Sequence, residues 1–544
     1  MNFAKLPKSK ITEYLIPITI YFGVIFLVFG FHFNAYNPTM KALFAGVLTD
    51  EPFTDTYFLC CIGYNYLWGW LFSTVPSIDW YSLTILCFYI THSFLLLRLL
   101  PTLNLENNIF GLPSWLSKIF IQLCFLLPLH FLLDFTIAAC IGFVLCVLNL
   151  VLIKNTKKAV ILLTVLGSLC ILLRHDAVLI VLAFIVPVLY WMFKINIRTI
   201  VIKSITYLSL LFAILTAVFI ININSEALYI KGEPLFYFIS DGDLRVQNIN
   251  QTAEDSIKIK AIERYLLFDS KNIQYDYLKK ISITPLNFGL IKYIVLKFDK
   301  VIHQFAKSIS LNYALVLFWI AMLVIVILRG KDKKSIFLSH LLILIGLYLV
   351  TVFIKMEGRI LFPIMFVSLL SFYFRLNRLG KLNNYLIIII AVLSILFVFD
   401  LAQNQKNIEI ENQTILKQIA ENHPGKTILV DAATSNILNI GPFKEIRTDE
   451  NEFYTVDMGQ MTIIPQYQKF LKSKCKCDIS SALELFKFIE SKNNQFIYIS
   501  TESRLGLVKQ YLSTIYQYNL PFQKMKFGED NSQGYIFYQK LKTP

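Results

Sequence analysis

The residues that could do chemistry are acids and cations gathered at a few points between long apolar stretches. In chain order they are Asp50, Glu51 and Asp55; Asp134; Arg174, His175 and Asp176; and Lys355, Glu357 and Arg359. A carboxylate can take the proton from an attacking hydroxyl. A second carboxylate, for which Asp134 is the candidate, can hold a divalent cation such as Mg²⁺ or Mn²⁺. A pair of cations can hold a phosphate, and we expect Lys355, Arg359, Arg174, His175 and Asp176 to bind the substrate. These residue types suit the transfer of a group from a phosphate-bearing donor to a hydroxyl acceptor.

The composition indicates where such chemistry would take place. The chain has 544 residues, of which 56% are hydrophobic and only 16% are charged, and its mean hydropathy is +0.59. A soluble globular protein carries about 25% charged residues. The composition therefore excludes a soluble enzyme, a disordered chain and a disulfide scaffold, and it favours a protein that crosses a membrane many times.

Apolar stretches long enough for a bilayer core predict eleven membrane spans. Their expected ranges are 14–33, 81–98, 117–134, 135–153, 159–175, 177–193, 204–222, 309–328, 335–354, 359–375 and 384–400. The pieces at 117–134 and 159–175 are short enough to be re-entrant or tilted segments. Every second connection is basic, as in the group Arg329, Lys331, Lys333 and Lys334. Because cytoplasmic loops collect Lys and Arg, we expect the N-terminus inside and the C-terminus outside. The net charge of +15 is then a topology signal and no sign of nucleic-acid binding.

Three segments on the expected outer side are large. The first outer loop, 34–80, mixes acids with aromatics, and its apolar centre predicts an interfacial amphipathic helix. The second, 223–308, contains helical patterns near 253–268 and 284–306. After residue 400 the composition becomes polar: strand patterns at Thr427 to Val430, Phe496 to Ser500 and Gly534 to Tyr538 alternate with helical ones at 411–422, 480–491 and 503–517. We expect a membrane domain over 1–400 and a small α/β domain over 401–544.

All the candidate acids and cations fall at outer ends of spans in this topology. Charges are costly within the bilayer, whereas the headgroup level is where a lipid-carried sugar presents its phosphate. Lys355 and Arg359 could hold that phosphate while a carboxylate accepts the proton of an acceptor hydroxyl. We therefore expect the first-loop carboxylates within about 10 Å of Lys355 or Arg359.

Three short motifs resemble those of the C-type (GT-C) membrane glycosyltransferases, which use polyprenyl-phosphate sugars and include the protein mannosyltransferase, family 39-like group. They are TDEPFTDTYF after the first span, KMEGRILFP at 355–363, and ITPLNFGLIKYIVLKF at 283–298. The resemblance implies that Asp50 or Glu51 is the catalytic acid/base, and that Lys355 and Arg359 face the lipid phosphate. It also implies a GT-C-like fold, a polyprenyl-phosphate-linked sugar as donor, and a glycan, lipid-linked or protein acceptor on the outer face of the plasma membrane. Asp134 stands alone where many members have a second acidic cluster.

Each candidate also has a plainer interpretation. The first-loop acids could be solvated surface. Asp134 could cap a helix before Phe135 and Thr136. Arg174 and Asp176 could form an ion pair within a turn, and Lys355 and Arg359 could be headgroup anchors. The alternatives for the whole protein are a surface-polysaccharide polymerase or ligase, a transporter of lipid-linked glycans, and a non-catalytic structural protein. Richness in lysine, asparagine and isoleucine suggests a bacterial cell envelope.

Overall fold

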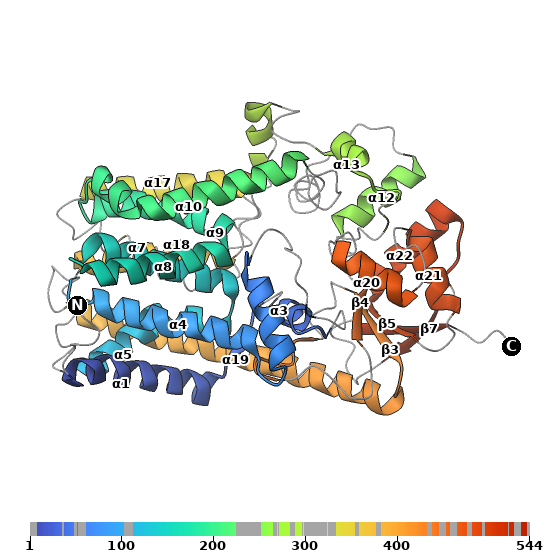
Figure 1. The fold of residues 1–544 in the computed structure, drawn as a ribbon, viewed down its shortest axis with the longest axis horizontal. Coiled ribbons are helices and arrows are strands. Elements are labelled where there is room, and N and C mark those ends of the chain that lie inside the picture. The colour runs from blue at the N-terminus through green and yellow to red at the C-terminus, as the bar shows by residue number, and fades with distance from the viewer. Residues whose placement is uncertain are drawn as a thin grey trace.

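The computed structural model contains a helix bundle and a mixed β-sheet joined by one long helix (Figure 1). It describes residues 8–34, 37–47, 52, 61–102, 112–224, 252–264, 269, 271–282, 289–295, 297–298, 324, 333–353, 358–376, 382–431, 438–444, 453–456, 465–475, 481–491, 496–520, 522–526 and 535–540. The bundle lies on the left of Figure 1 and the sheet on the right.

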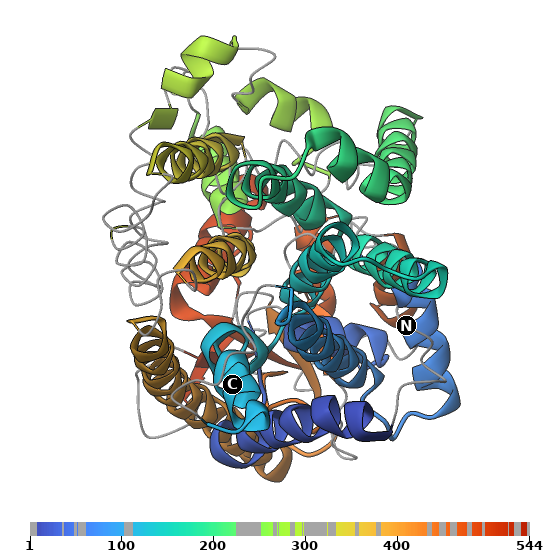
Figure 2. The same ribbon diagram turned by 90° about the vertical axis from the view of Figure 1, so that its left-hand side faces the viewer.

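The bundle consists of helices that run roughly along one direction, so that most are seen end-on in Figure 2. They are α1 (Lys8–Val24), η2 (Ile25–Phe29), α4 (Trp80–Leu99), α5 (Ser114–Phe125), α6 (Leu127–His130), α7 (Phe135–Leu152), α8 (Lys157–Leu173), α9 (His175–Pro187), η5 (Val188–Met192), α10 (Ile197–Asn224), α17 (Lys333–Phe353), α18 (Gly358–Leu376) and α19 (Leu382–Asn422). The central element is α7, which packs against α4, α8, α9 and α18. Nearly all of its residues are buried, because apolar side chains cover its whole circumference.

The coarse prediction of a helical membrane protein is confirmed. Four helical segments of the described chain are long and apolar enough to cross a membrane: Trp80–Leu99, Phe135–Leu152, Ile197–Ala217 and Ile388–Asn422. Four shorter apolar helices accompany them at Glu13–Phe29, Ser114–Phe125, His175–Trp191 and Leu361–Leu370. Helices occupy ten of the eleven predicted ranges, and in the remaining range, 309–328, the structure describes residue 324 alone. The count of eleven spans and their sidedness stay predictions.

The range 117–134 is not one helix. Helix α5 ends at Phe125, and a short α6 follows, with Pro128 in its first turn. Proline has no backbone N–H to continue the ladder from the preceding turn. The chain then extends into β2 (Leu132–Leu133), which pairs in parallel with β1 (His32–Phe33) at the end of the first helix.

The two outer loops contain short helices. In the first loop, α2 (Asn37–Phe44) and α3 (Tyr64–Thr74) form, and α3 falls in the apolar centre of the loop, where a helix was predicted. It buries Trp68 and Phe72 and exposes Tyr66 and Trp70. In the second, α12 (Ala253–Glu263) ends earlier than predicted, and α13 (Tyr275–Ile281) was not predicted.

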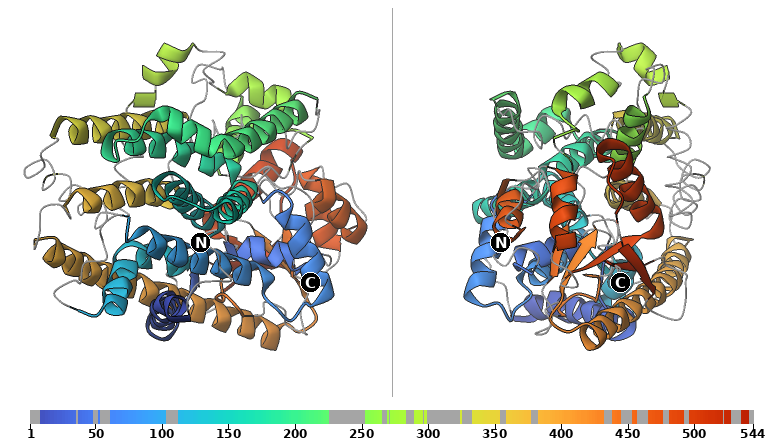
Figure 3. Two further views of the ribbon diagram at one scale, coloured as in Figure 1. Left: turned by 60° about the vertical axis from the view of Figure 1, so that its left-hand side comes forward. Right: turned by 90° about the vertical axis from the view of Figure 1, so that its right-hand side faces the viewer.

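The C-terminal sheet has the order β4-β3-β5-β7-β6. Its strands are β3 (Thr427–Asp431), β4 (Phe453–Val456), β5 (Phe496–Thr501), β6 (Phe522–Lys526) and β7 (Tyr535–Lys540), and its helices are α20 (Pro465–Cys475), α21 (Ala482–Ser491) and α22 (Glu502–Tyr516). Strands β4, β3 and β5 are parallel to one another. Strand β7 runs antiparallel to both of its neighbours, β5 and β6. Figure 3 (right) shows this sheet and its helices in front of the bundle. The three predicted strands and the helices at 480–491 and 503–517 are confirmed.

Candidate functional site

The candidate site lies where the ends of several bundle helices meet the first outer loop. Of the residues predicted from the sequence, Asp50, Glu51, Asp55, Lys355 and Glu357 lie outside the described residues. Arg359 falls in the first turn of α18, a helix that packs against α7 and α9. Asp134, Arg174, His175 and Asp176 are described with their side chains.

Backbone hydrogen bonds join the first outer loop to the turn between α8 and α9. The amide of Cys61 donates to the carbonyl of Leu173 at 3.0 Å, and the amide of Ile62 donates to Leu172 at 2.8 Å. The residue that follows Leu173 in the chain is Arg174. The loop that carries the predicted base is therefore held, at its residue 61, beside the turn that carries Arg174, His175 and Asp176.

A second set of contacts brings Asp134 to the same end. The pairing of β1 with β2 ties the end of the first helix to the residues just before Asp134. The guanidinium of Arg174 lies over the ring of Phe135, 5.4 Å from its centroid. The start of the first outer loop, Asp134 and the Arg174 turn therefore share one end of the bundle, as the sequence predicted for the outer ends of these spans.

Asp134 is completely buried and has four N–H donors around its carboxylate. Oδ1 accepts from the amides of Thr136 at 2.7 Å and Ile137 at 3.0 Å, which caps α7. Oδ2 accepts from the side-chain amides of Asn34 at 2.9 Å and Asn37 at 3.3 Å. A carboxylate has about four acceptor positions, so these donors leave no room for a cation. The geometry matches the helix-cap interpretation and does not fit a metal ligand.

The described part of the chain contains no group of three or more His, Cys, Asp or Glu side chains placed to hold a metal ion.

The Arg174 turn matches the interpretation as an internal ion pair. Arg174 Nε lies 2.9 Å from Asp176 Oδ1, and the Asp176 side chain is half exposed. His175 begins α9 and is buried. The guanidinium is thus fixed by Asp176 on one side and by the Phe135 ring below it, at a helix N-terminus whose amides also favour an anion.

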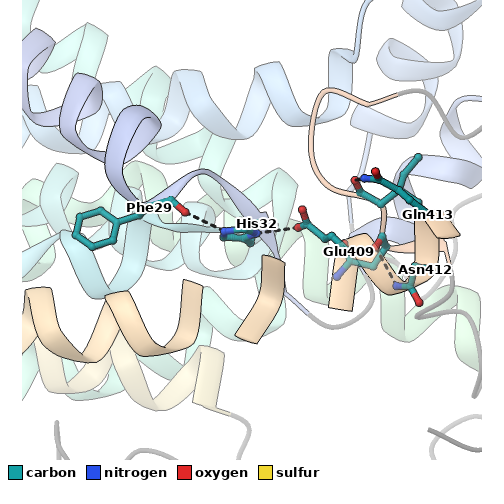
Figure 4. A network of polar contacts seen from close by, with 7 residues as sticks. Phe29, His32, Glu409, Asn412 and Gln413 are labelled. Atoms are coloured by element: carbon teal, nitrogen blue, oxygen red, sulfur yellow. Dashed lines mark hydrogen bonds and ion pairs between the residues drawn. The ribbon is translucent and has the colours of Figure 1, made fainter. Parts of the chain in front are cut away.

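Sequence reasoning missed a buried ion pair and a buried His–Glu hydrogen bond at this end. Lys41 Nζ lies 2.7 Å from Asp79 Oδ2, and both side chains are about nine-tenths buried. His32 Nδ1 lies 2.8 Å from Glu409 Oε1 of α19, and its Nε2 donates to the carbonyl of Phe29 at 3.0 Å (Figure 4). The available signal was that Lys41 is the only basic residue of a loop rich in acids. Nothing local in the sequence indicates a pair separated by 377 positions.

No known protein-family model matches this chain, and no curated protein is significantly similar to it in sequence.

Proposed function

We propose that this protein is a membrane glycosyltransferase that moves a sugar from a polyprenyl-phosphate carrier to a hydroxyl of a glycan, lipid-linked or protein acceptor. The proposal includes the finer architecture expected from the sequence: eleven spans, a GT-C-like arrangement, an inside N-terminus and an extracytoplasmic C-terminal α/β domain. It places the reaction at the outer face of a bacterial plasma membrane.

One observation carries the proposal. Three segments far apart in the sequence meet at one end of an apolar helix bundle. The first outer loop is hydrogen-bonded to Asp134 through Asn34 and Asn37. Its residues 61 and 62 are hydrogen-bonded to residues 173 and 172, just before Arg174. Each segment carries or adjoins ionisable residues predicted to act on the donor. Ionisable groups gathered at the rim of a bilayer, away from its centre, match a donor whose phosphate lies at the headgroup level.

The mechanism assigns the base to the first outer loop and the phosphate contacts to cations. Asp50 or Glu51 would take the proton of the acceptor hydroxyl as its oxygen attacks the anomeric carbon, with Asp55 as the third candidate. The bond from that carbon to the phosphate oxygen breaks, and the polyprenyl phosphate leaves with the electron pair. Arg359 and Lys355, with Arg174 at the start of α9, would stabilise the charge of the leaving phosphate.

The test uses the full-length protein in lipid nanodiscs with radiolabelled polyprenyl-phosphate hexoses and pentoses as donors. We expect release of polyprenyl phosphate coupled to labelling of a glycan or protein acceptor from the membrane fraction. Asp50→Asn or Glu51→Gln should reduce turnover by about 10²–10⁴-fold, the usual contribution of a general base. Arg359→Ala should weaken donor binding.

Asp276→Asn is the matched control, because Asp276 is an exposed acid of the second outer loop in α13. It should leave turnover unchanged. Full activity in Asp50→Asn, Glu51→Gln and Asp55→Asn alike would exclude this loop as the source of the base. Movement of intact lipid-linked glycan across the bilayer without sugar transfer would establish the transporter alternative, and successive addition of whole repeat units would establish a polymerase.

A further inference from the structure

The crossover between strands β3 and β4 includes a segment, Leu438 to Lys444, that lies against helix α19; we call it the strap. The side-chain amide of Asn412 donates to the carbonyl of Asn439 at 3.0 Å, and that of Gln413 donates to Ile440 at 2.9 Å. Gly441 has φ +103°, and a Cβ there would lie 2.8 Å from Oε2 of Glu409. A residue with a Cβ at position 441 would therefore strain this path of the strap.

The same turn of α19 is bonded to the first helix. Glu409 pairs with His32, and both residues are at most 5% exposed. Because the Phe29 carbonyl and the carboxylate flank the two ring nitrogens of His32, the ring is fixed at both ends (Figure 4). Helix α19, the strap and the end of the first helix thus form one connected polar network.

The other side of the strap is bonded to both ends of the first outer loop. Lys41, near the start of the loop, donates to the carbonyl of Lys444 at 2.7 Å. Asp79, at its end, accepts from the amide of Phe443 at 3.0 Å and also caps α4 through Ser82. Lys41 and Asp79 pair with each other, so one buried ion pair closes the loop and fastens it to the strap.

The strap follows the carboxyl end of β3 in the chain. From Gln413 to Asn422, α19 extends about 13 Å beyond the strap contact. Strand β3 begins at Thr427, and its last residue, Asp431, precedes the strap by seven positions in the chain. From β3 the chain passes to β4 on one side and later to β5 on the other. In open α/β sheets, ligands bind at the carboxyl ends of strands where the order reverses in this way.

We infer that Lys41 and Asp79 are positioning residues that hold the carboxyl edge of the β4-β3-β5 sheet against the first outer loop, through the strap. This inference rests on the proposed function for its catalytic meaning. A glycan acceptor bound at the sheet edge then lies next to the loop whose acids take the proton from its hydroxyl. The acceptor site and the base are coupled by one buried ion pair.

The experiment measures hydrogen exchange of the strap in the full-length protein in nanodiscs, with no substrate. Lys41→Met and Asp79→Asn should each speed exchange of peptides covering 438–444 and 37–47 by about tenfold or more, because an unpaired buried charge opens the contact. Asparagine still caps α4, so Asp79→Asn isolates the charge. Lys41→Arg keeps a cation and should restore most of the protection.

Lys118→Met is the matched control. Lys118 is also buried, pairs with Glu13 and lies over the ring of Tyr14, as Lys41 lies over Phe33. Its loss should lower the melting temperature without changing exchange in the strap. Equal exchange in Lys41→Met and Lys118→Met would overturn the inference, as would strap protection unchanged in Asp79→Asn. Peptides of β5 serve as the internal reference.

The kinetic arm separates this inference from the proposed function. In an active preparation, Lys41→Met should raise the KM for the acceptor while the KM for the donor stays unchanged, and Lys41→Arg should recover it. Absence of sugar transfer in the wild type refutes the proposed function and leaves the exchange result intact. Transfer with an unchanged acceptor KM in Lys41→Met refutes only the coupling.

Discussion

At the scale of single residues, Asp134 was a candidate metal ligand and is a buried helix cap. Its carboxylate accepts four N–H groups, two from α7 and two from Asn34 and Asn37. Asp134→Ala removes a helix cap and leaves buried amide donors without acceptors, so we expect a loss of about 2–4 kcal/mol. Asp134→Asn should cost less. Thermal unfolding in detergent, compared with Asp276→Asn, checks the order. A stabilisation by Mg²⁺ or Mn²⁺ that Asp134→Asn abolishes would contradict the cap.

A buried chain of three rings gives a second prediction for single residues. His92 Nε2 donates to the carbonyl of Ala138 at 3.0 Å, and its Nδ1 lies 3.2 Å from Nε2 of His130. His130 Nδ1 lies 3.2 Å from the hydroxyl of Tyr21. Because a carbonyl only accepts, uncharged rings can satisfy this chain in one way: Tyr21 donates to His130, which donates to His92. Both histidines should therefore carry their proton on Nε2, which ¹⁵N NMR of labelled histidine measures.

Removal of the first donor tests the same chain by stability. Tyr21→Phe leaves Nδ1 of His130 buried without a hydrogen bond and should cost about 1–3 kcal/mol. Tyr64→Phe is the comparison. The Tyr64 hydroxyl donates a long, 3.4 Å hydrogen bond to the carbonyl of Leu169 in the last turns of α8, so its removal should cost less. Equal losses of unfolding free energy in the two variants would mean that the hydrogen bond from Tyr21 to His130 contributes no particular stability.

What the sequence revealed at this scale was local. An Asp before Phe135 and Thr136 indicated a cap, and Arg174 two residues before Asp176 indicated a turn with an ion pair, and the geometry matches both. The pairs Lys41–Asp79 and His32–Glu409 join residues 38 and 377 positions apart. No periodicity or spacing relates such residues, because only the packed fold brings them together.

At the scale of elements, helix α22 holds the second outer loop through a buried carboxylate. Asp269 Oδ2 accepts from the hydroxyls of Tyr511 and Tyr516, each at 2.8 Å, and from Asn272 at 2.9 Å. Burial, reinforced by the hydrogen bond to Asp269, raises the pKa of Tyr516 to about 12. The pKa of Tyr511 is raised further, mainly by burial.

This raised pKa predicts a loss of stability in alkali. An unfolded tyrosine loses its proton near pH 10, while the folded Tyr516 keeps its proton to about pH 12. The unfolded chain therefore binds fewer protons in that window, and stability falls as pH rises through it. Thermal unfolding at pH 9 and pH 11 should show a smaller alkaline loss for Tyr511→Phe/Tyr516→Phe than for the wild type. An identical loss would show that the pKa values of these two phenols are not raised in the folded protein.

Elements were predictable where one pattern extends over enough residues. The long apolar stretches and the strands β3, β5 and β7 are continuous runs rich in apolar residues, so their sequences alone indicated them. Strands β4 and β6 are the two edge strands of the sheet, and β6 carries two lysines in five residues, as edge strands often do. The break between α5 and α6 follows from Pro128 together with the β1–β2 pairing, and the pairing could not be predicted from either segment alone.

At the scale of the whole molecule, α19 decides how the two parts relate. It continues from an apolar bundle helix into a polar segment that carries Glu409, Asn412 and Gln413 to the strap (Figure 1). The sequence indicated its apolar half as a span and its polar end, 411–422, as a separate helix. The structure makes them one helix of 41 residues, so the sheet is attached to the bundle by a rigid connection, with the strap as a second attachment.

Sidedness is the prediction on which the proposed chemistry depends. If the basic connections are cytoplasmic, the first outer loop and the start of α18 share the opposite compartment, and Lys157, the exposed first residue of α8, lies inside. In a cysteine-free background, Glu51→Cys and Arg359→Cys should react with a membrane-impermeant maleimide added to intact cells. Lys157→Cys should react only after the cells are opened. Labelling of Glu51→Cys and Arg359→Cys from different sides would separate the base from the phosphate contact, and no sugar transfer could then use both.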